Sequence, residues 1–408
     1  MSRETANSVG EMANPRGGTA NSRGGIAHSR GEVRPMGAAG VRRHNLALVL
    51  REVADGEPVS RAAVAARTGL TRGTVSSLVE ELLDGGLVTE LAAARGGTGR
   101  PANPLQLNRS GPAGLGVEIG VDHVGACVVD LAGAVRAVRT AESDHRGRAP
   151  AVGLRTAAAL AAEVIAEAGL AVVGATVALP GVVGPRGELQ RAPNLPRWID
   201  VPVTAELSGL LRGLPVGTGN EADLAALAEL WCGGGPPDML YVSGEIGVGG
   251  AIVLGGGLFR GAGGRAGELG HVVVDPGGPR CSCGGRGCLE QAAGQDALLA
   301  AAGATDVDDL LARQHDAVPA AAVDAAGRAL GVALAGAVNL LDVPAVVLGG
   351  LYARLGTPLR DAVAAELDTR VLTSPPVDIR SSVLGADAAL RGAATSVVRA
   401  LLQLPPAS

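Results

Sequence analysis

The sequence contains no lysine and only five aromatic residues among its 408 positions. Without lysine the chain cannot form a Schiff base, and it cannot supply the lysine of a phosphate-binding loop. Five aromatic side chains are too few for a platform on which single-stranded nucleic acid stacks. The longest run without charge, residues 168–185, contains two prolines and four glycines. It therefore predicts a buried strand followed by a loop and not a membrane-spanning helix.

Cysteine is scarce and unevenly placed, since three of the five cysteines fall between residues 281 and 288. This clustering favours a metal site in a reducing compartment over a disulfide framework. The N-terminus lacks the continuous apolar core of a signal peptide, so we expect a cytoplasmic protein without a membrane partner.

Residues 1–108 hold 13 arginines and 10 acidic residues, against 22 arginines and 30 acidic residues in the remainder. This weakly basic front permits a nucleic-acid partner without requiring one.

Residues 1–40 repeat short Thr-Ala-Asn-Ser and Ser-Arg-Gly-Gly sequences and contain almost no large apolar side chains. Such a composition cannot offset the entropy of ordering, so we predict a disordered extension. The alternative is a translation start further downstream, because Met36 stands just before the first credible helix.

Residues 41–108 predict three helices followed by a hairpin. The first helix ends at Asp55, the second runs from a Ser60 cap to Thr68, and the third begins at Thr71. Two short strands, at 87–91 and 104–107, flank a loop rich in glycine and arginine. This order is typical of a winged helix-turn-helix domain that binds double-stranded DNA. The alternative is a three-helix interaction module without DNA contact.

The third of these helices carries polar side chains near its N-terminus, the end that enters the major groove in such domains. Arginine can bind guanine in a bidentate manner, and serine or threonine can reach bases or phosphates. An arginine at the hairpin tip can reach the minor groove or the backbone, or it can be a solvated loop charge. The expected DNA-binding residues are Arg72, Thr74, Ser76, Ser77 and Arg100.

Residues 109–408 have the composition of a large α/β body. Strand hairpins followed by alternating strands and helices occur twice, which predicts two lobes with a cleft between them. Strands are expected at 115–121, 125–131, 135–140, 172–179, 214–217, 239–243, 249–254 and 345–348, and the main helices at 149–168, 222–230, 320–341 and 359–370.

The strongest chemical pattern is a histidine followed by three cysteines within 18 residues: His271, Cys281, Cys283 and Cys288. One imidazole and three thiolates make a closed tetrahedral set, which is the arrangement of structural zinc. Because no position stays open, we expect no catalysis by this metal. The alternative is a set of unrelated thiols in a flexible loop. The other two cysteines, Cys127 and Cys232, are expected to be small core residues.

Together these features resemble the ROK family, named for its repressors, open reading frames and kinases. The resemblance spans nearly everything from residue 41 onward, and it rests on the winged helix, residues 192–195, 220–223 and 265–271, and the block 281–290. It implies an actin-like, two-lobed body of the sugar-kinase type. For chains with an N-terminal winged helix it implies a transcriptional repressor that responds to sugars.

The resemblance also implies a set of sugar contacts: Asn194, Asn220, Glu221, Glu268, His271 and Glu290. Carboxylates and amides suit this task, because they accept from and donate to vicinal hydroxyls. Taken singly, three of these residues have other interpretations. Asn194 could be a turn residue, Asn220 a helix cap and Glu290 a solvated helix charge.

The chain departs from the kinase pattern at three places. Residues 118–122 lack the second glycine and the hydroxyl of a phosphate loop, Glu221 stands at the position of the catalytic aspartate, and Glu245 would repel a phosphate. We therefore expect no catalytic residues and a sugar-responsive repressor that assembles as a dimer or tetramer. The alternatives are an active sugar kinase with a DNA-binding domain, and a constitutive DNA-binding protein with a vestigial sugar cleft.

Overall fold

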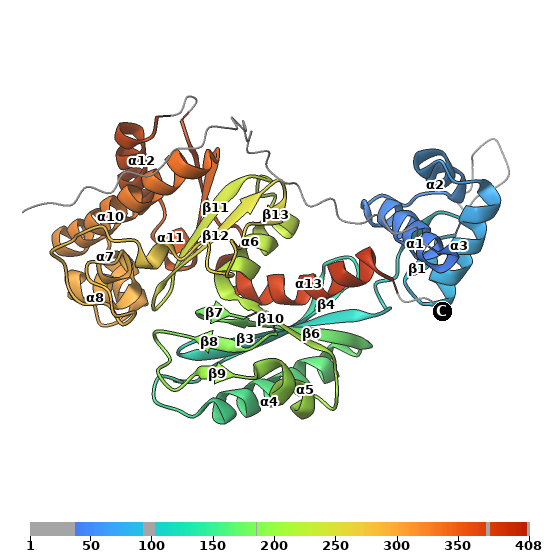
Figure 1. The fold of residues 1–408 in the computed structure, drawn as a ribbon, viewed down its shortest axis with the longest axis horizontal. Helices are drawn as coiled ribbons and strands as arrows, with labels where there is room; N and C mark the ends of the chain where they lie inside the picture. Colours follow the sequence, from blue (N-terminus) through green and yellow to red (C-terminus); the bar gives the residue numbers. More distant parts are fainter. Residues whose placement is uncertain (1–36, 93–102, 185, 373–375, 406–408) are drawn as a thin grey trace, which may run out of the picture. The chain divides into compact units, whose positions relative to one another are not determined.

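The computed structural model describes residues 37–92, 103–184, 186–372 and 376–405. The N-terminal domain begins with three helices, α1 (Ala38–Ala54), α2 (Arg61–Thr68) and α3 (Arg72–Asp84). Strands β1 (Val88–Glu90) and β2 (Leu105–Leu107) then pair antiparallel. This is the predicted winged helix-turn-helix (Figure 1).

Caps fix the ends of the short helices. Ser60 Oγ accepts from Ala63 N at 3.2 Å, and Gly69 ends α2 with a φ of 72°. Thr71 Oγ1 accepts from Thr74 N at 3.2 Å and begins α3. The apolar stripe of α3 is buried at Val75, Leu78, Val79 and Leu82, whereas Leu83 is half-buried.

One prediction for the N-terminal region is corrected by the structure, and others concern residues that the structure does not describe. Disorder through residue 40 is wrong at its end, because α1 already begins at Ala38. Its first alanines are good helix formers that face solvent, so no apolar periodicity marks them. The remainder of the proposed extension, residues 1–36, and Arg100 at the hairpin tip lie outside the described residues.

The first lobe of the body is built on a five-stranded sheet with the order β10-β6-β3-β4-β5. Helix α4 packs on one face of this sheet and α13 on the other, as Figure 1 shows. A second, three-stranded sheet with the order β7-β8-β9 leads into α5. The bounds are β3 (Ala113–Ile119), β4 (His123–Asp130), β5 (Val135–Glu142), α4 (Pro150–Ala168), β6 (Val172–Leu179), β7 (Val182–Val183), β8 (Leu189–Arg191), β9 (Ile199–Val201), α5 (Val203–Leu210), β10 (Val216–Asn220) and α13 (Ala388–Gln403).

Glycine on β3 allows the last helix of the chain to lie against the sheet. A Cβ on Gly116 would clash with the backbone carbonyl of Leu390, and one on Gly114 would clash with that of Ala394. The chain therefore needs glycine at both positions for the close approach of α13.

The second lobe is built on a five-stranded sheet with the order β13-β12-β11-β14-β15. Helix α6 packs against both α13 of the first lobe and β12 of the second, so it joins the two. The bounds are α6 (Glu221–Cys232), β11 (Met239–Gly244), β12 (Val248–Leu254), β13 (Gly257–Leu258), η1 (Leu269–His271), α7 (Glu290–Ala293), α8 (Gln295–Ala302), α9 (Val307–Ala312), α10 (Ala317–Leu341), β14 (Ala345–Gly349), α11 (Gly350–Leu355), α12 (Thr357–Arg370), β15 (Asp378–Ser381) and η2 (Gly385–Asp387).

Helix α10 has the length and apolar composition of a membrane-spanning helix, but 56% of its most apolar window is buried inside the molecule. It packs against α12 and α8 as the central helix of the second lobe's core.

The two isolated cysteines differ in their surroundings. Cys127 on β4 is buried, as predicted. Cys232 is exposed, so the prediction of a core position is wrong there. Its exposure follows from its place as the last residue of α6, where the helix leaves the packed interior.

Candidate ligand cleft and metal centre

A cleft with contributions from both lobes brings together all six residues for which sugar contacts were predicted. The turn between β3 and β4 and the start of α6 line it from the first lobe, and the turn between β11 and β12 lines it from the second. Its polar lining includes Glu118, Asp122, His123, Asn194, Asn220, Glu221, Asp223, Tyr241, Ser243, Glu245, Glu268, His271, Glu290 and Gln295.

Asn220 is the N-cap of α6 as well as a lining residue. Its Oδ1 accepts from Ala222 N at 2.8 Å and from Asp223 N at 3.1 Å, while its Nδ2 donates to Gly181 O at 2.9 Å. The capping interpretation is therefore confirmed. Because the cap occupies most of the amide, only one donor hydrogen is left for a ligand.

Glu221 is the first residue of α6 and faces a crowded set of carboxylates. Burial, followed by the charges of Glu118 and Glu245, raises the pKa of Glu221 to about 8. Desolvation of the carboxylate within the cleft, followed by the charge of Glu118, likewise raises the pKa of Glu245 to about 7. At neutral pH Glu221 is therefore mostly protonated, so it can donate a hydrogen bond as well as accept one.

Glu290 and Asn194 lie where the cleft meets the cysteine loop. Glu290 is only 9% exposed, and its Oε2 accepts from Val248 N at 3.4 Å. The interpretation of Glu290 as a solvated charge is therefore wrong, because α7 directs its first residue inward toward the start of β12. Asn194 Oδ1 accepts from Ser282 Oγ at 3.4 Å, and Arg191 donates to Cys283 O at 3.4 Å. These two contacts connect the first lobe to the cysteine loop of the second.

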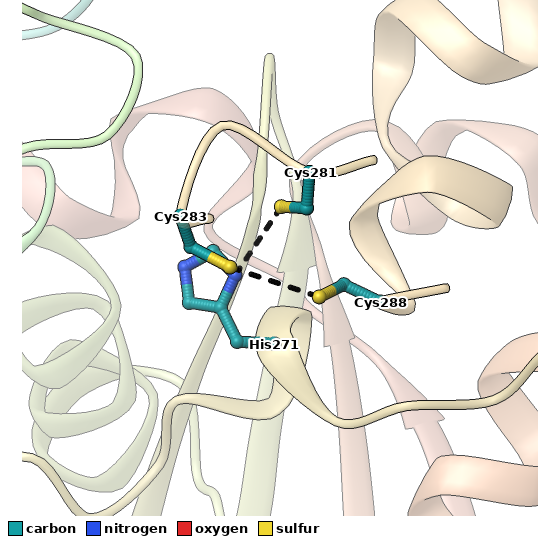
Figure 2. A group of neighbouring side chains, drawn as sticks. All are labelled: His271, Cys281, Cys283 and Cys288. Atoms are coloured by element: carbon teal, nitrogen blue, oxygen red, sulfur yellow. Dashed lines mark hydrogen bonds between the residues drawn. The ribbon is translucent and has the colours of Figure 1, made fainter. Parts of the chain in front are cut away.

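The histidine and the three cysteines converge, as Figure 2 shows. Their four ligand atoms all lie within 4.8 Å of one another. The Sγ atoms of Cys283 and Cys288 are 3.7 Å apart, and His271 Nδ1 is 3.7 Å from Cys281 Sγ. Bonds of the length that zinc forms to sulfur and nitrogen place tetrahedral ligands roughly 3.6–3.8 Å apart, so this set fits the ion.

Backbone hydrogen bonds fold the cysteine loop on itself. Cys281 N donates to Gly285 O at 3.0 Å, and Gly287 N donates to Pro279 O at 2.8 Å. Gly285 N lies 3.3 Å from Cys283 Sγ, in the position of a donor to a thiolate. This closed arrangement favours a shared metal site over unrelated thiols in a flexible loop.

Known proteins share this architecture. The sequence model that describes the ROK family matches residues 114–400 of this chain. The chain belongs to the ROK family. The model of the MarR family matches residues 47–97, which contain most of the winged helix. Both parts of the predicted fold, the winged helix and the ROK body, are thereby confirmed.

Relatives of this ROK protein include regulators and kinases. It is 27% identical to the xylose repressor of Bacillus subtilis, over 89% of this chain and 97% of that protein. It is 30% identical to the kanosamine kinase of Amycolatopsis mediterranei, over 69% of this chain and 95% of the kinase. A solved ROK transcriptional regulator, a homologue of the Escherichia coli MLC protein, has a TM-score of 0.75 and 24% identity, and the match covers 89% of this chain and 97% of that chain. This last likeness shows the shared fold.

Two charged partners of residues that line the ROK cleft were not predicted from the sequence. His123 Nδ1 lies 3.0 Å from Asp122 Oδ1, and its Nε2 lies 3.6 Å from Glu118 Oε1. The contacts with Asp122 and then Glu118 raise the pKa of His123 to about 11, so the imidazole is a cation at neutral pH. Arg260 Nε lies 3.1 Å from Asp223 Oδ2. Asp223 is 8% exposed, and burial raises its pKa to about 6 despite this partner.

The predicted DNA-binding face of α3 is only partly accessible to DNA. Arg72 and Ser77 are exposed, and Thr74 and Ser76 are half-buried. Arg42 of α1 donates to Ser77 Oγ at 3.4 Å and forms an ion pair with Glu81 at 2.7 Å. Ser77 is therefore engaged within the domain, whereas Arg72 has the freest access to a groove. The sequence offered no periodic signal for this contact between helices.

Proposed function

We propose that this protein is a cytoplasmic, sugar-responsive transcriptional repressor that binds an operator through its winged helix and carries no kinase activity. The observation that supports this proposal most directly is that one chain joins a helix-turn-helix with polar residues on α3 to a cleft lined by hydrogen-bonding side chains. The xylose repressor of Bacillus subtilis is similar over both parts. We expect a homo-oligomer, because two half-sites about one helical turn apart require paired winged helices.

The cleft is proposed to bind a sugar through Asn194, Asn220, Glu221, Glu268, His271 and Glu290. Their amides, carboxylates and imidazole offer both donors and acceptors to vicinal hydroxyls. A sugar changes operator binding only if it binds one arrangement of the lobes more tightly than the other. A difference of about 1–3 kcal/mol is enough for a useful switch.

Zinc is the metal proposed for His271, Cys281, Cys283 and Cys288. When bound, it supplies structural cross-linking and no open coordination position. Nδ1 of His271 faces the thiols, while its Nε2 lies 4.0 Å from Glu268 Oε2. The same imidazole is thus proposed to ligate the metal and lies beside Glu268, a proposed sugar contact.

Operator binding is the first test of this function. The purified full chain is titrated onto the DNA upstream of its own gene and onto random DNA, at several salt concentrations. We expect a salt-sensitive preference for the upstream DNA. Equal affinity for both DNAs at every salt concentration would refute the repressor.

A kinase remains the second candidate, because the chain is also similar to kanosamine kinase and because Glu221, which the family resemblance puts at the position of the catalytic base, lines the cleft. A coupled assay of ATP consumption over a panel of sugars separates the two functions. The repressor proposal predicts no turnover. Turnover that Glu221→Gln abolishes would establish the kinase.

A further inference from the structure

The ROK body carries a second pocket that shares no residue with the ligand cleft. The body lines it with one face of α13, the last residues of α6, the turn between β4 and β5, and Arg109. The body side chains that can form hydrogen bonds there are Arg109, Trp231, Arg391, Thr395, Arg399 and Gln403. Among its described residues, the body contributes three arginines and no carboxylate to this lining.

These three arginines differ from their neighbour Arg136, which forms an ion pair with Asp130 at 3.2 Å. In the described part of the chain, no carboxylate lies within ion-pair distance of Arg109, Arg391 or Arg399. Arg391 and Arg399 are half-buried, so water solvates their charges only in part. A partly desolvated guanidinium without a partner is unfavourable, because charges inside proteins are normally paired. The pocket therefore offers positive charge to an anion from outside.

The arginines and a hydroxyl are arranged along one face of α13. Arg391, Thr395 and Arg399 follow one another at intervals of four residues, which places them on the same side of a helix. Thr395 is 6% exposed, and its hydroxyl has no hydrogen-bond partner among the described residues. The guanidinium of Arg399 lies over the ring of Trp231, 4.9 Å from its centroid. This cation–π contact orients the guanidinium but leaves its charge in place.

The spacing of these donors indicates the kind of anion. Eight residues of α-helix separate the Cα atoms of Arg391 and Arg399 by about 12 Å along the axis. The hydroxyl of Thr395 lies between them in sequence, and Arg109 adds a third guanidinium from outside the helix. Guanidinium groups match phosphate oxygens with two parallel hydrogen bonds each. Two guanidiniums with this separation suit an anion that presents more than one phosphate group.

We propose that this pocket is a second ligand site, which binds a small anion with two or more phosphate groups through Arg109, Arg391, Thr395 and Arg399. The site is distinct from the cleft proposed for the sugar, and its test does not depend on which sugar that cleft accepts.

Isothermal titration calorimetry of the full chain with inorganic pyrophosphate tests the site. The control R148Q/R155Q removes two exposed arginines of the body that line neither pocket. We expect the native chain and this control to bind pyrophosphate equally, and R391Q/R399Q to bind at least about tenfold more weakly, because two charge-assisted contacts are lost. R391Q alone keeps the contact between Arg399 and Trp231, and it should weaken binding by about threefold or more.

Sulfate at the same ionic strength separates a built site from general attraction to positive charge. We expect pyrophosphate to bind more tightly than sulfate, because only pyrophosphate presents two phosphate groups. Equal affinities for the two anions would overturn the inference.

Two further results would also overturn it. One is the absence of any heat of binding when the native chain is titrated with millimolar pyrophosphate. The other is unchanged affinity in R391Q/R399Q and R391Q, with both variants folded by circular dichroism, since the anion would then bind elsewhere, as in the ligand cleft.

A random DNA duplex is titrated onto the same variants, because DNA also presents consecutive phosphates. We expect R391Q/R399Q and the native chain to bind this duplex equally. Weaker binding of the duplex by R391Q/R399Q, in a protein that does not bind pyrophosphate, would assign these arginines to the DNA backbone and contradict the proposed small-anion site.

Discussion

Glu221 gives the clearest prediction at the scale of single residues, because its pKa of about 8 is far above the ordinary value of 4.5. The folded chain holds this proton more tightly than the unfolded chain does. The resulting stabilisation is complete below about pH 4.5 and is lost as the pH rises toward about 8. Glu118, Glu245, Asp122 and His123 are the charged groups that face it.

We therefore expect Glu221→Gln to become more stable relative to the native chain as the pH rises from about 5 to about 8. Thermal unfolding midpoints at four pH values in this range measure the difference. Glu206→Gln, exposed on α5, is the control and should follow the native profile. Parallel profiles for the native chain and Glu221→Gln would contradict the raised pKa.

Arg72 is the residue of the winged helix with the freest access to DNA. We expect Arg72→Ala to weaken operator binding by about 1–3 kcal/mol, because a bidentate contact to a base or a charge on a phosphate is lost. Fluorescence anisotropy with labelled operator measures the loss. Arg155→Ala removes an exposed arginine from α4 in the body and should leave the affinity unchanged. Equal effects of the two substitutions would argue against α3 as the reading helix.

The sequence predicted which residues line the cleft, but it did not predict the ion-pair partners of those residues. The six proposed sugar contacts were found because their motifs match those of a family, and the structure places them all along one cleft. His123 and Arg260 were not found, because an ion pair depends on where the chain returns in space. Arg260 lies 37 positions from Asp223 in the sequence, and no period or spacing joins the two.

At the scale of secondary structure, long elements with one buried face were predicted and the others were not. The strand Val172–Leu179 and the helices of the winged domain have the expected bounds within about three residues. Strands β7, β8 and β9 have two or three residues each, which is too short for a period of two to be visible. Helix α13 packs on both α6 and the sheet, so its buried residues form a near-continuous run instead of a stripe.

The cysteine loop and η1 form an element that a metal ion is expected to hold together. We expect Cys288→Ser to lose stoichiometric zinc and to lower the thermal midpoint, because one of four ligands is removed. Metal analysis by mass spectrometry and thermal unfolding measure the two effects. Cys232→Ser, at an exposed position outside the cluster, is the matched control and should change neither. A native chain without zinc after metal-free purification and zinc reconstitution would contradict the assignment.

At the scale of the whole molecule, the account depends on coupling between the cleft and the winged helix. Asn220 and Glu221 stand at the N-terminal end of helix α6, and this helix packs on elements of both lobes. Closure of the lobes over a sugar would therefore change the contacts of this helix. Asn194 and Arg191 add contacts between the first lobe and the cysteine loop. The account requires that a sugar bind one arrangement of these contacts more tightly than another and thereby change operator binding.

The most direct test of this account is the affinity of the full chain for its own upstream DNA, measured by anisotropy while unphosphorylated sugars are added one at a time. We predict that at least one sugar changes the dissociation constant by about fivefold or more, and that Glu290→Gln weakens this response while sugar-free operator binding persists. Tight operator binding that no sugar in a broad panel alters, with no sugar raising the thermal midpoint, would contradict the account.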